Sequence, residues 1–232
     1  FMGSVGNNDV LGRFIGLYGF SELPFIALKH LELSWKLGTG LAVTNRKFDT
    51  NFNPENIAIG SHLNMMIVMA LKAQYRLNKS SYSLGIDITH FSNSAFKVPN
   101  LGLNVPYFSL GYSRKFGNVR NSEIDAKAKF IRKKIYFGAS FKGSVKELIP
   151  KGGPKYPIYA GNLFARSTLG PKAGFELGLD VFSNQAHTNF EPLVSKTQWT
   201  LFQLGIYSAY FVPMNHIHFV FGMGAYIRDW YR

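Results

Sequence analysis

Two residues near the middle of the chain have the types and spacing to cleave an ester. His90 and Ser92 are separated by one residue at the end of a segment in which apolar and polar residues alternate. Successive side chains of a β-strand point to opposite faces, so both residues should project from one face, with Cα atoms about 6.5–7 Å apart. An imidazole this close can take the proton of a serine hydroxyl and make it a nucleophile. The same face carries apolar or aromatic side chains: Tyr82, Leu84, Ile86 and Ile88.

A third residue, Asn104, begins the next alternating segment and could complete the group. It shares parity with Phe108, Leu110 and Tyr112, so it should point to the same face as His90 if Pro106 introduces no bulge. An amide oxygen at this place can accept the imidazole N–H. Because a lone His-x-Ser pattern is not specific, the alternative is a structural cluster of polar residues at the rim of a barrel.

The alternation that positions these residues recurs along the whole chain. Apolar residues alternate with polar or very small ones in the segments 31–37, 63–75, 174–181 and 217–226. Such alternation over about ten residues is typical of transmembrane β-strands. Strands of this length exceed those usual in soluble sheets. The sequence therefore predicts an all-β fold, an antiparallel transmembrane β-barrel.

Turn-forming residues divide the chain into ten long strands. We expect these at 13–20, 31–43, 62–77, 82–92, 104–116, 131–142, 158–168, 174–183, 199–212 and 217–230, with a partial strand at 1–4. Tight turns at 78–81, 169–172 and 213–216 should lie at one end, and longer loops at 44–61, 93–103, 143–157 and 184–198 at the other, outer end. Bacterial barrels have even strand numbers. We therefore expect residues 1–232 to be a fragment of one barrel domain of about twelve strands, with 10–11 visible and terminal strands missing.

Composition narrows the function. The chain has 232 residues, a net charge of +13 and no cysteine, so it offers no thiolate or disulfide chemistry. Lys and Arg fall mostly in the expected loops, which favours solvated charge or attraction to anionic lipid headgroups over nucleic-acid binding. The histidines have no metal-binding spacing, and no phosphate-binding glycine loop is present. We expect neither a metal nor another cofactor.

The fifteen residues His90–Asn104 resemble a known signature. The run His90-Phe91-Ser92-Asn93-Ser94-Ala95-Phe96-Lys97-Val98-Pro99-Asn100-Leu101-Gly102-Leu103-Asn104 is similar to the motif of the lipid A 3-O-deacylases of the PagL type. It is more similar still to related Bacteroidetes barrels usually labelled acyloxyacyl hydrolases. The resemblance implies an outer-membrane enzyme that removes an ester-linked acyl chain from lipid A at a site on the outside of the barrel.

The resemblance also implies roles for individual residues. Ser92 takes the position of the nucleophile and His90 that of the general base, while Asn93, Ala95 and Asn100 fall in the region of the oxyanion hole and substrate positioning. The third catalytic position differs, because Asn104 stands where the family has Glu. An amide cannot stabilise an imidazolium by charge.

Three functions follow from these observations. The leading hypothesis is an outer-membrane serine esterase that acts on lipid A, lipopolysaccharide or another outer-leaflet lipid. The alternative is a catalytically weak or inactive barrel that serves as a structural or accessory subunit of an envelope complex, which Asn104 favours. A solute channel is the third. Side chains that fill the interior, such as the inward-facing Lys72 and Asp87, would argue against a channel.

Overall fold

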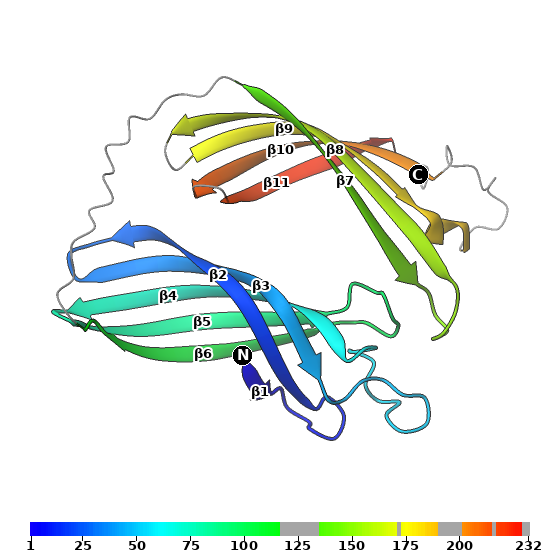
Figure 1. Ribbon diagram of the computed structural model, residues 1–232, viewed down its shortest axis with the longest axis horizontal. Coiled ribbons are helices and arrows are strands. Elements are labelled where there is room, and N and C mark those ends of the chain that lie inside the picture. Colours follow the sequence, from blue (N-terminus) through cyan, green and yellow to red (C-terminus); the bar gives the residue numbers. More distant parts are fainter. Residues whose placement is uncertain (117–134, 171–172, 190–200, 215–216, 229–232) are drawn as a thin grey trace. The chain divides into compact units, whose positions relative to one another are not determined.

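The computed structural model describes residues 1–116, 135–170, 173–189, 201–214 and 217–228 (Figure 1). Within these ranges the chain forms antiparallel strands and one short 3-10 helix, Gln185–Asn189, so the predicted all-β fold class is confirmed. No helix in the described ranges is long and apolar enough to cross a membrane. The strands are β1 (Met2–Ser4), β2 (Arg13–Ala27), β3 (Leu31–Thr44), β4 (Leu63–Leu77), β5 (Ser80–Ser92), β6 (Leu103–Arg114), β7 (Tyr136–Glu147), β8 (Lys155–Gly170), β9 (Ala173–Asn184), β10 (Phe202–Met214) and β11 (Ile217–Arg228).

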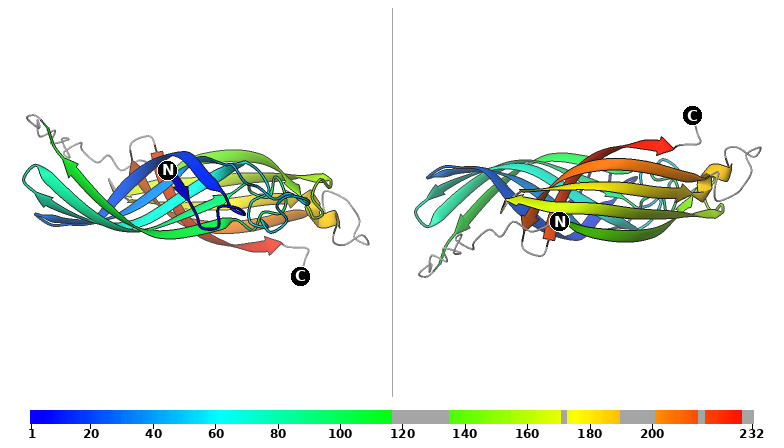
Figure 2. Two further views of the ribbon diagram at one scale, coloured as in Figure 1. Left: turned by 90° about the horizontal axis from the view of Figure 1, so that it is seen from below. Right: turned by 90° about the horizontal axis from the view of Figure 1, so that it is seen from above.

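The chain divides into two compact units, each built on one sheet. The first unit comprises residues 1–122 and 147–153, and its sheet has the order β1-β2-β3-β4-β5-β6. The second comprises 123–146 and 154–232, and its sheet has the order β11-β10-β9-β8-β7. Within each sheet, strands that follow one another in sequence lie side by side (Figure 2). Each sheet is therefore a simple up-and-down meander.

The two faces of the first sheet differ in the way the alternation predicts, most regularly on β4. On one face, Asn64, Met66, Val68 and Ala70 are buried, whereas Leu63, Met65, Ile67, Met69 and Leu71 are exposed on the other. Large apolar side chains at this density on a surface mark a face that meets an apolar partner.

The ends of β2 and β7 differ most from the predicted bounds. β2 continues to Ala27, past the predicted end at residue 20, and its pairing with β3 shifts register between Pro24 and Ile26. A proline removes a ladder hydrogen bond, and an irregularity of this kind lets the strand continue past it. β7 runs to Glu147, so the predicted loop at 143–157 is shorter than expected. The predicted connection 117–130 lies outside the described residues.

The ends of the hairpins can be compared directly in the first sheet. β4 and β5 are joined by a tight turn in which Asn78 has a φ of 50°, and the last pair of that hairpin is Leu77 with Ser80. The loop 93–102 leaves the opposite end of β5, as predicted. The predicted turns of the second sheet fall partly on 171–172 and 215–216, which lie outside the described residues.

Aromatic side chains gather toward the tight-turn end of the first sheet. The rings of Tyr82 and Tyr112 lie 5.3 Å apart between centroids, and those of Phe25 and Trp35 lie 5.9 Å apart. Tyr75 pairs across the sheet with Tyr82. An exposed row of aromatics at one end of an apolar band is typical of an interfacial girdle.

Buried side chains fill the other face of the first sheet. Near the loop end, Phe14 and Phe91 pack with ring centroids 4.5 Å apart in an apolar cluster with Met66, Val68 and Ile59. Toward the turn end the cluster gives way to polar pairs. Lys72 forms an ion pair with Glu22 at 3.0 Å, and Ser109 donates a hydrogen bond to Asp87.

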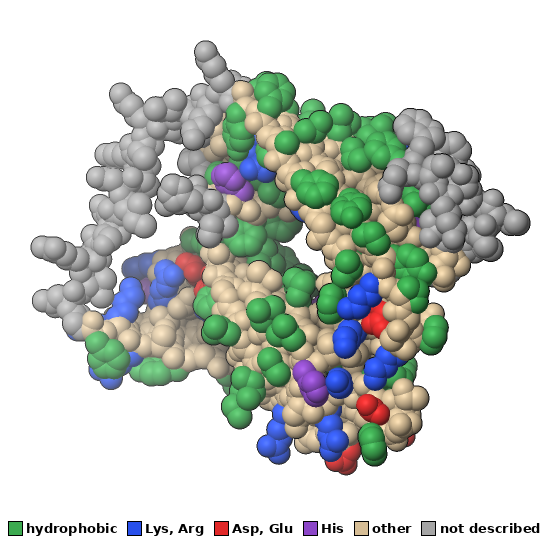
Figure 3. Space-filling view, turned by 45° about the vertical axis from the view of Figure 1, so that its right-hand side comes forward, with side chains coloured by type: hydrophobic (Ala, Val, Ile, Leu, Met, Phe, Trp, Pro, Cys, Tyr) green, Lys and Arg blue, Asp and Glu red, His purple; other side chains and the backbone are tan. Residues whose placement is uncertain are grey.

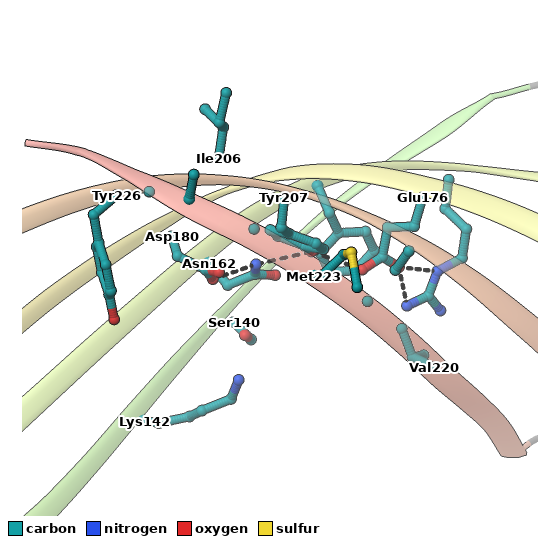
Figure 4. A pocket seen from close by; sticks show the side chains of 17 residues that line it. Ser140, Lys142, Asn162, Glu176, Asp180, Ile206, Tyr207, Val220, Met223 and Tyr226 are labelled. Carbon is teal, nitrogen blue, oxygen red and sulfur yellow. Dashed lines mark hydrogen bonds and ion pairs between the residues drawn. The ribbon is translucent and has the colours of Figure 1, made fainter.

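The second sheet carries its own polar network on one face (Figure 4). Asn162 donates to Asp180 and to the Tyr207 hydroxyl, both at 2.9 Å, and Tyr207 donates to Glu176 at 2.6 Å. Arg166 forms an ion pair with Glu176. The charged side chains described here are thus held by partners within their own sheet, as buried polar groups require.

Candidate active site

Two neighbouring strands, β5 and β6, bring the candidate residues together at the loop end of the first sheet. His90 and Ser92 lie near and at the end of β5, and His90 is directly opposite Asn104 on β6. On the other side, Ser92 is opposite Met65 of β4. Pro106 pairs regularly with Ile88, so no bulge disturbs the register. The predicted parity of all three candidate residues is therefore confirmed.

His90 and Asn104 form the hydrogen bond that their register allows. The distance between His90 Nδ1 and Asn104 Oδ1 is 2.7 Å. With the amide oxygen as acceptor, Nδ1 carries the proton and the other ring nitrogen, Nε2, is left with its lone pair. A neutral imidazole in this tautomer can act as a base through Nε2.

The Ser92 hydroxyl accepts hydrogen bonds from the loop that follows it. Asn100 Nδ2 donates to Ser92 Oγ at 2.9 Å, and the backbone N–H of Ser94 donates at 3.1 Å. Asn100 is itself oriented, because its Oδ1 accepts the N–H of Asn93 at 3.0 Å. Two donors on one oxygen stabilise negative charge there and leave the hydroxyl proton to be donated elsewhere.

The described residues include no hydrogen bond between Ser92 and His90. Both side chains are partly exposed on the same face, two positions apart on one strand. In enzymes without bound substrate, the contact between nucleophile and base is often long and closes only when substrate is present. The geometry thus supplies an oriented imidazole beside a hydroxyl held by donors.

Ser94 and Ala95, which follow Ser92 closely in the chain, adopt a backbone conformation that L-residues rarely take. Ser94 has a φ of 57° and Ala95 a φ of 59°, both in the left-handed region. Successive N–H groups in such a turn converge and can hold an anion. The Ser94 N–H points at Ser92 Oγ, while the Ala95 N–H meets no acceptor among the described residues.

Asn93 ties this loop to its neighbour and does not contact the Ser92 hydroxyl through its side chain. It is buried, and its Nδ2 donates to Ser61 Oγ at 2.9 Å and to the Lys97 carbonyl at 3.0 Å. Of the three residues predicted for the oxyanion region, Asn100 therefore contacts Ser92, Ala95 offers a backbone N–H nearby, and Asn93 fixes the loop. Their catalytic roles stay a prediction.

The loop 45–62 supports the candidate site from the side. The N–H groups of Leu101 and Gly102 donate to the carbonyls of Ile57 and Ala58. Gly60 approaches the other loop so closely that a Cβ there would lie 2.5 Å from the Pro99 carbonyl. Further along the same loop, hydrogen bonds from the backbone N–H groups of Asn51 and Phe52 lower the pKa of Asp49.

Four residues of this arrangement were not predicted as site residues. Two of them, Ser61 and Glu147, bind the loop 93–102 from outside. The other two lie in the loop: the Ser94 N–H donates to Ser92, and Gly102 leaves room for the His90 ring. Gly102 and Ser94 lie inside the motif His90–Asn104, so the motif itself could have indicated them as site residues. Nothing in the local sequence links Ser61 or Glu147 to Ser92, because their contacts depend on how distant loops pack.

The surface around the three residues is apolar. Ile86 is 60% exposed, Phe108 78% and Met65 45%, all on the face that carries Ser92. Figure 3 shows hydrophobic side chains spread over the visible surface of the molecule. A nucleophile in such surroundings is accessible to a lipid chain and poorly placed for a water-soluble ester.

Comparison with known families agrees with this geometry. The family model for lipid A 3-O-deacylase (PagL) matches residues 3–113, nearly half of the chain. Residues 3–113 are thus similar to the lipid A 3-O-deacylases of the PagL type. The match contains β2 to β6 almost entirely, and with them His90, Ser92, Asn104 and the connecting loop. No curated protein and no solved structure matches the chain.

The match to the PagL family supports a broad function and a location. The family consists of outer-membrane β-barrel enzymes that deacylate lipid A, so the match supports a lipid A deacylase function in the outer membrane. The family acts on lipid A, the lipid part of lipopolysaccharide, which supports a lipid partner for this chain. The closer likeness to the Bacteroidetes branch stays a prediction.

Proposed function

We propose that the chain is a serine esterase in which Ser92 is the nucleophile, His90 the general base and Asn104 the residue that orients His90. The hydrogen bond of 2.7 Å between His90 and Asn104, on the face that carries Ser92, is the observation on which the proposal rests. Nε2 of His90 takes the hydroxyl proton as Ser92 Oγ attacks the carbonyl carbon of the ester. The sugar alcohol then leaves with the proton from His90, and water hydrolyses the acyl-enzyme by the same route.

The negative charge of the tetrahedral intermediate needs donors already in place. Asn100 already contacts Ser92 Oγ at 2.9 Å, and the Ala95 N–H belongs to the left-handed turn that follows Ser92. Preorganised donors of this kind contribute on the order of 10²–10³ in rate each. Asn93 holds the loop in which both of these residues lie.

The proposed substrate geometry follows from the exposed apolar face. We propose that this face is embedded in the outer leaflet, with Ile86 and Phe108 against acyl chains and the site close to the headgroups. The exposed Tyr82 and Tyr112 toward the turn end fit the opposite interface. Assembly into an envelope complex stays a further prediction.

Mass spectrometry of purified lipid A incubated with the folded protein tests this function. We expect lipid A lighter by one ester-linked acyl chain, together with the free fatty acid. A lipophilic fluorophosphonate should label the peptide that contains Ser92 and block the reaction. Intact lipid A and an unlabelled Ser92 in correctly folded protein would instead favour the accessory role that Asn104 suggests.

Gly102 offers a test of how precisely His90 is held. It has a φ of 75°, and a Cβ at this position would lie 2.7 Å from His90 Cε1. We expect Gly102→Ala to displace the imidazole and to lower kcat about tenfold, since misplacement by about 1 Å can cost more. The initial rate of fatty-acid release from lipid A at saturating substrate measures this fall in kcat.

A matched control separates displacement of His90 from backbone strain. Gly6 also has a positive φ, of 118°, but a Cβ there would meet no atom within 4 Å. Gly6→Ala should therefore retain the wild-type rate. Equal rates for Gly102→Ala and the wild type would show that His90 does not need its present position.

A further inference from the structure

A buried glutamate outside the family match contacts the loop that carries the candidate oxyanion donors. Glu147 is the last residue of β7 and, with the residues to Gly153, belongs to the first unit. It is 3% exposed. Its two carboxylate oxygens accept backbone N–H groups, one from Val98 at 3.2 Å and one from Gly152 at 2.5 Å. Among the described residues, no Lys or Arg forms an ion pair with it.

Burial of a carboxylate without a cation is costly, and backbone donors offset only part of that cost. The arrangement therefore needs a reason beyond general stability. Glu147 contacts the loop at a second point, where its own N–H donates to the Ala95 carbonyl at 3.0 Å. One residue thus holds both Ala95 and Val98.

The held segment contains the strained turn beside Ser92. Ser94 and Ala95 both have left-handed backbones, which are unfavourable for residues with a Cβ and persist only where surrounding contacts enforce them. The carbonyl that Glu147 binds belongs to Ala95 itself. Release of that carbonyl would let the turn relax and would move the N–H groups of Ser94 and Ala95 away from Ser92.

We propose that Glu147 is a positioning residue that holds the Ser94–Ala95 turn in its left-handed conformation and so keeps its N–H groups directed at the reacting atoms. The catalytic consequence rests on the proposed esterase function. The positional claim does not, because it concerns only the conformation of the loop.

Glu147→Gln is the sharpest test, because it keeps the size of the side chain and replaces one acceptor oxygen by an N–H₂ donor. That donor would face the N–H of Val98 or Gly152. The main-chain N–H that binds the Ala95 carbonyl is kept, so the variant tests whether the carboxylate is needed to hold that N–H in place. We expect faster amide hydrogen exchange in peptides covering 93–98. We also expect kcat for fatty-acid release to fall about tenfold or more while KM stays within about twofold, since binding is retained and alignment is lost.

A second buried glutamate provides the matched control. Glu176 on β9 is 4% exposed and lies in the second unit. Glu176→Gln should leave exchange at 93–98 and kcat unchanged. If Glu147→Gln does not fold by circular dichroism, Glu147→Asp, which keeps the charge on a shorter side chain, is measured in its place and should show the same split.

The outcomes separate the inference from the function. Unchanged exchange at 93–98 in the folded Glu147 variant overturns the inference. Faster exchange with unchanged kcat overturns its catalytic part. A wild type that releases no fatty acid contradicts the proposed function, and the exchange measurement alone then decides whether Glu147 holds the turn.

Discussion

Ser92→Ala is expected to abolish release of fatty acid from lipid A, with a loss of at least about 10⁴-fold in kcat. The variant removes the proposed nucleophile, while the strand pairing that positions residue 92 is kept. Asn100 Nδ2 and the Ser94 N–H would lose one shared acceptor. Mass spectrometry of lipid A and of the released fatty acid over a long incubation measures the effect.

Ser109→Ala is the matched control for this experiment. Ser109 lies on the same sheet but points to the opposite face, where it donates to Asp87 at 2.6 Å. We expect Ser109→Ala to release fatty acid from lipid A at the wild-type rate. Fatty-acid release by Ser92→Ala at a rate near that of Ser109→Ala would remove Ser92 from the mechanism.

The strands and the relation of His90 to Asn104 could be predicted from sequence for a simple physical reason. Side chains on a strand alternate between the two faces of the sheet, and strands paired in regular register place opposite residues on the same face. The position of Asn104 beside His90 can therefore be predicted once β5 and β6 are located. The regular alternation of β4 made its two faces equally predictable.

The loop around Ser92 could not be predicted in the same way. Its shape depends on a left-handed backbone at Ser94 and Ala95, although neither is a glycine. It also depends on side-chain contacts with the loop 45–62 and with Glu147. These contacts join segments far apart in the chain, and no periodicity encodes them. The extension of β2 past Pro24 was missed for a related reason, because a register shift absorbs the proline.

Asn104→Glu is expected to raise kcat, by roughly tenfold to a hundredfold, less than the ~10⁴ that the charge and tautomer together supply in a serine protease. In this chain the amide oxygen already selects the tautomer through its contact of 2.7 Å with His90 Nδ1. What it lacks is a negative charge to stabilise the imidazolium that forms when Ser92 is deprotonated. Asn104 is exposed at the end of β6 next to partly exposed His90, so a carboxylate can be accommodated without burial.

Asn104→Gln separates charge from length, because glutamine has the size of glutamate and no charge. Its rate should stay at or below that of the wild type, whereas the glutamate variant exceeds both in fatty-acid release from lipid A. The gain should also be larger above the pKa of a carboxyl group than at acid pH, where the new side chain is protonated and resembles an amide. If wild type, Asn104→Glu and Asn104→Gln are all folded and all inert, the amide marks a barrel that has lost its chemistry, and the accessory role accounts for the chain better than hydrolysis does.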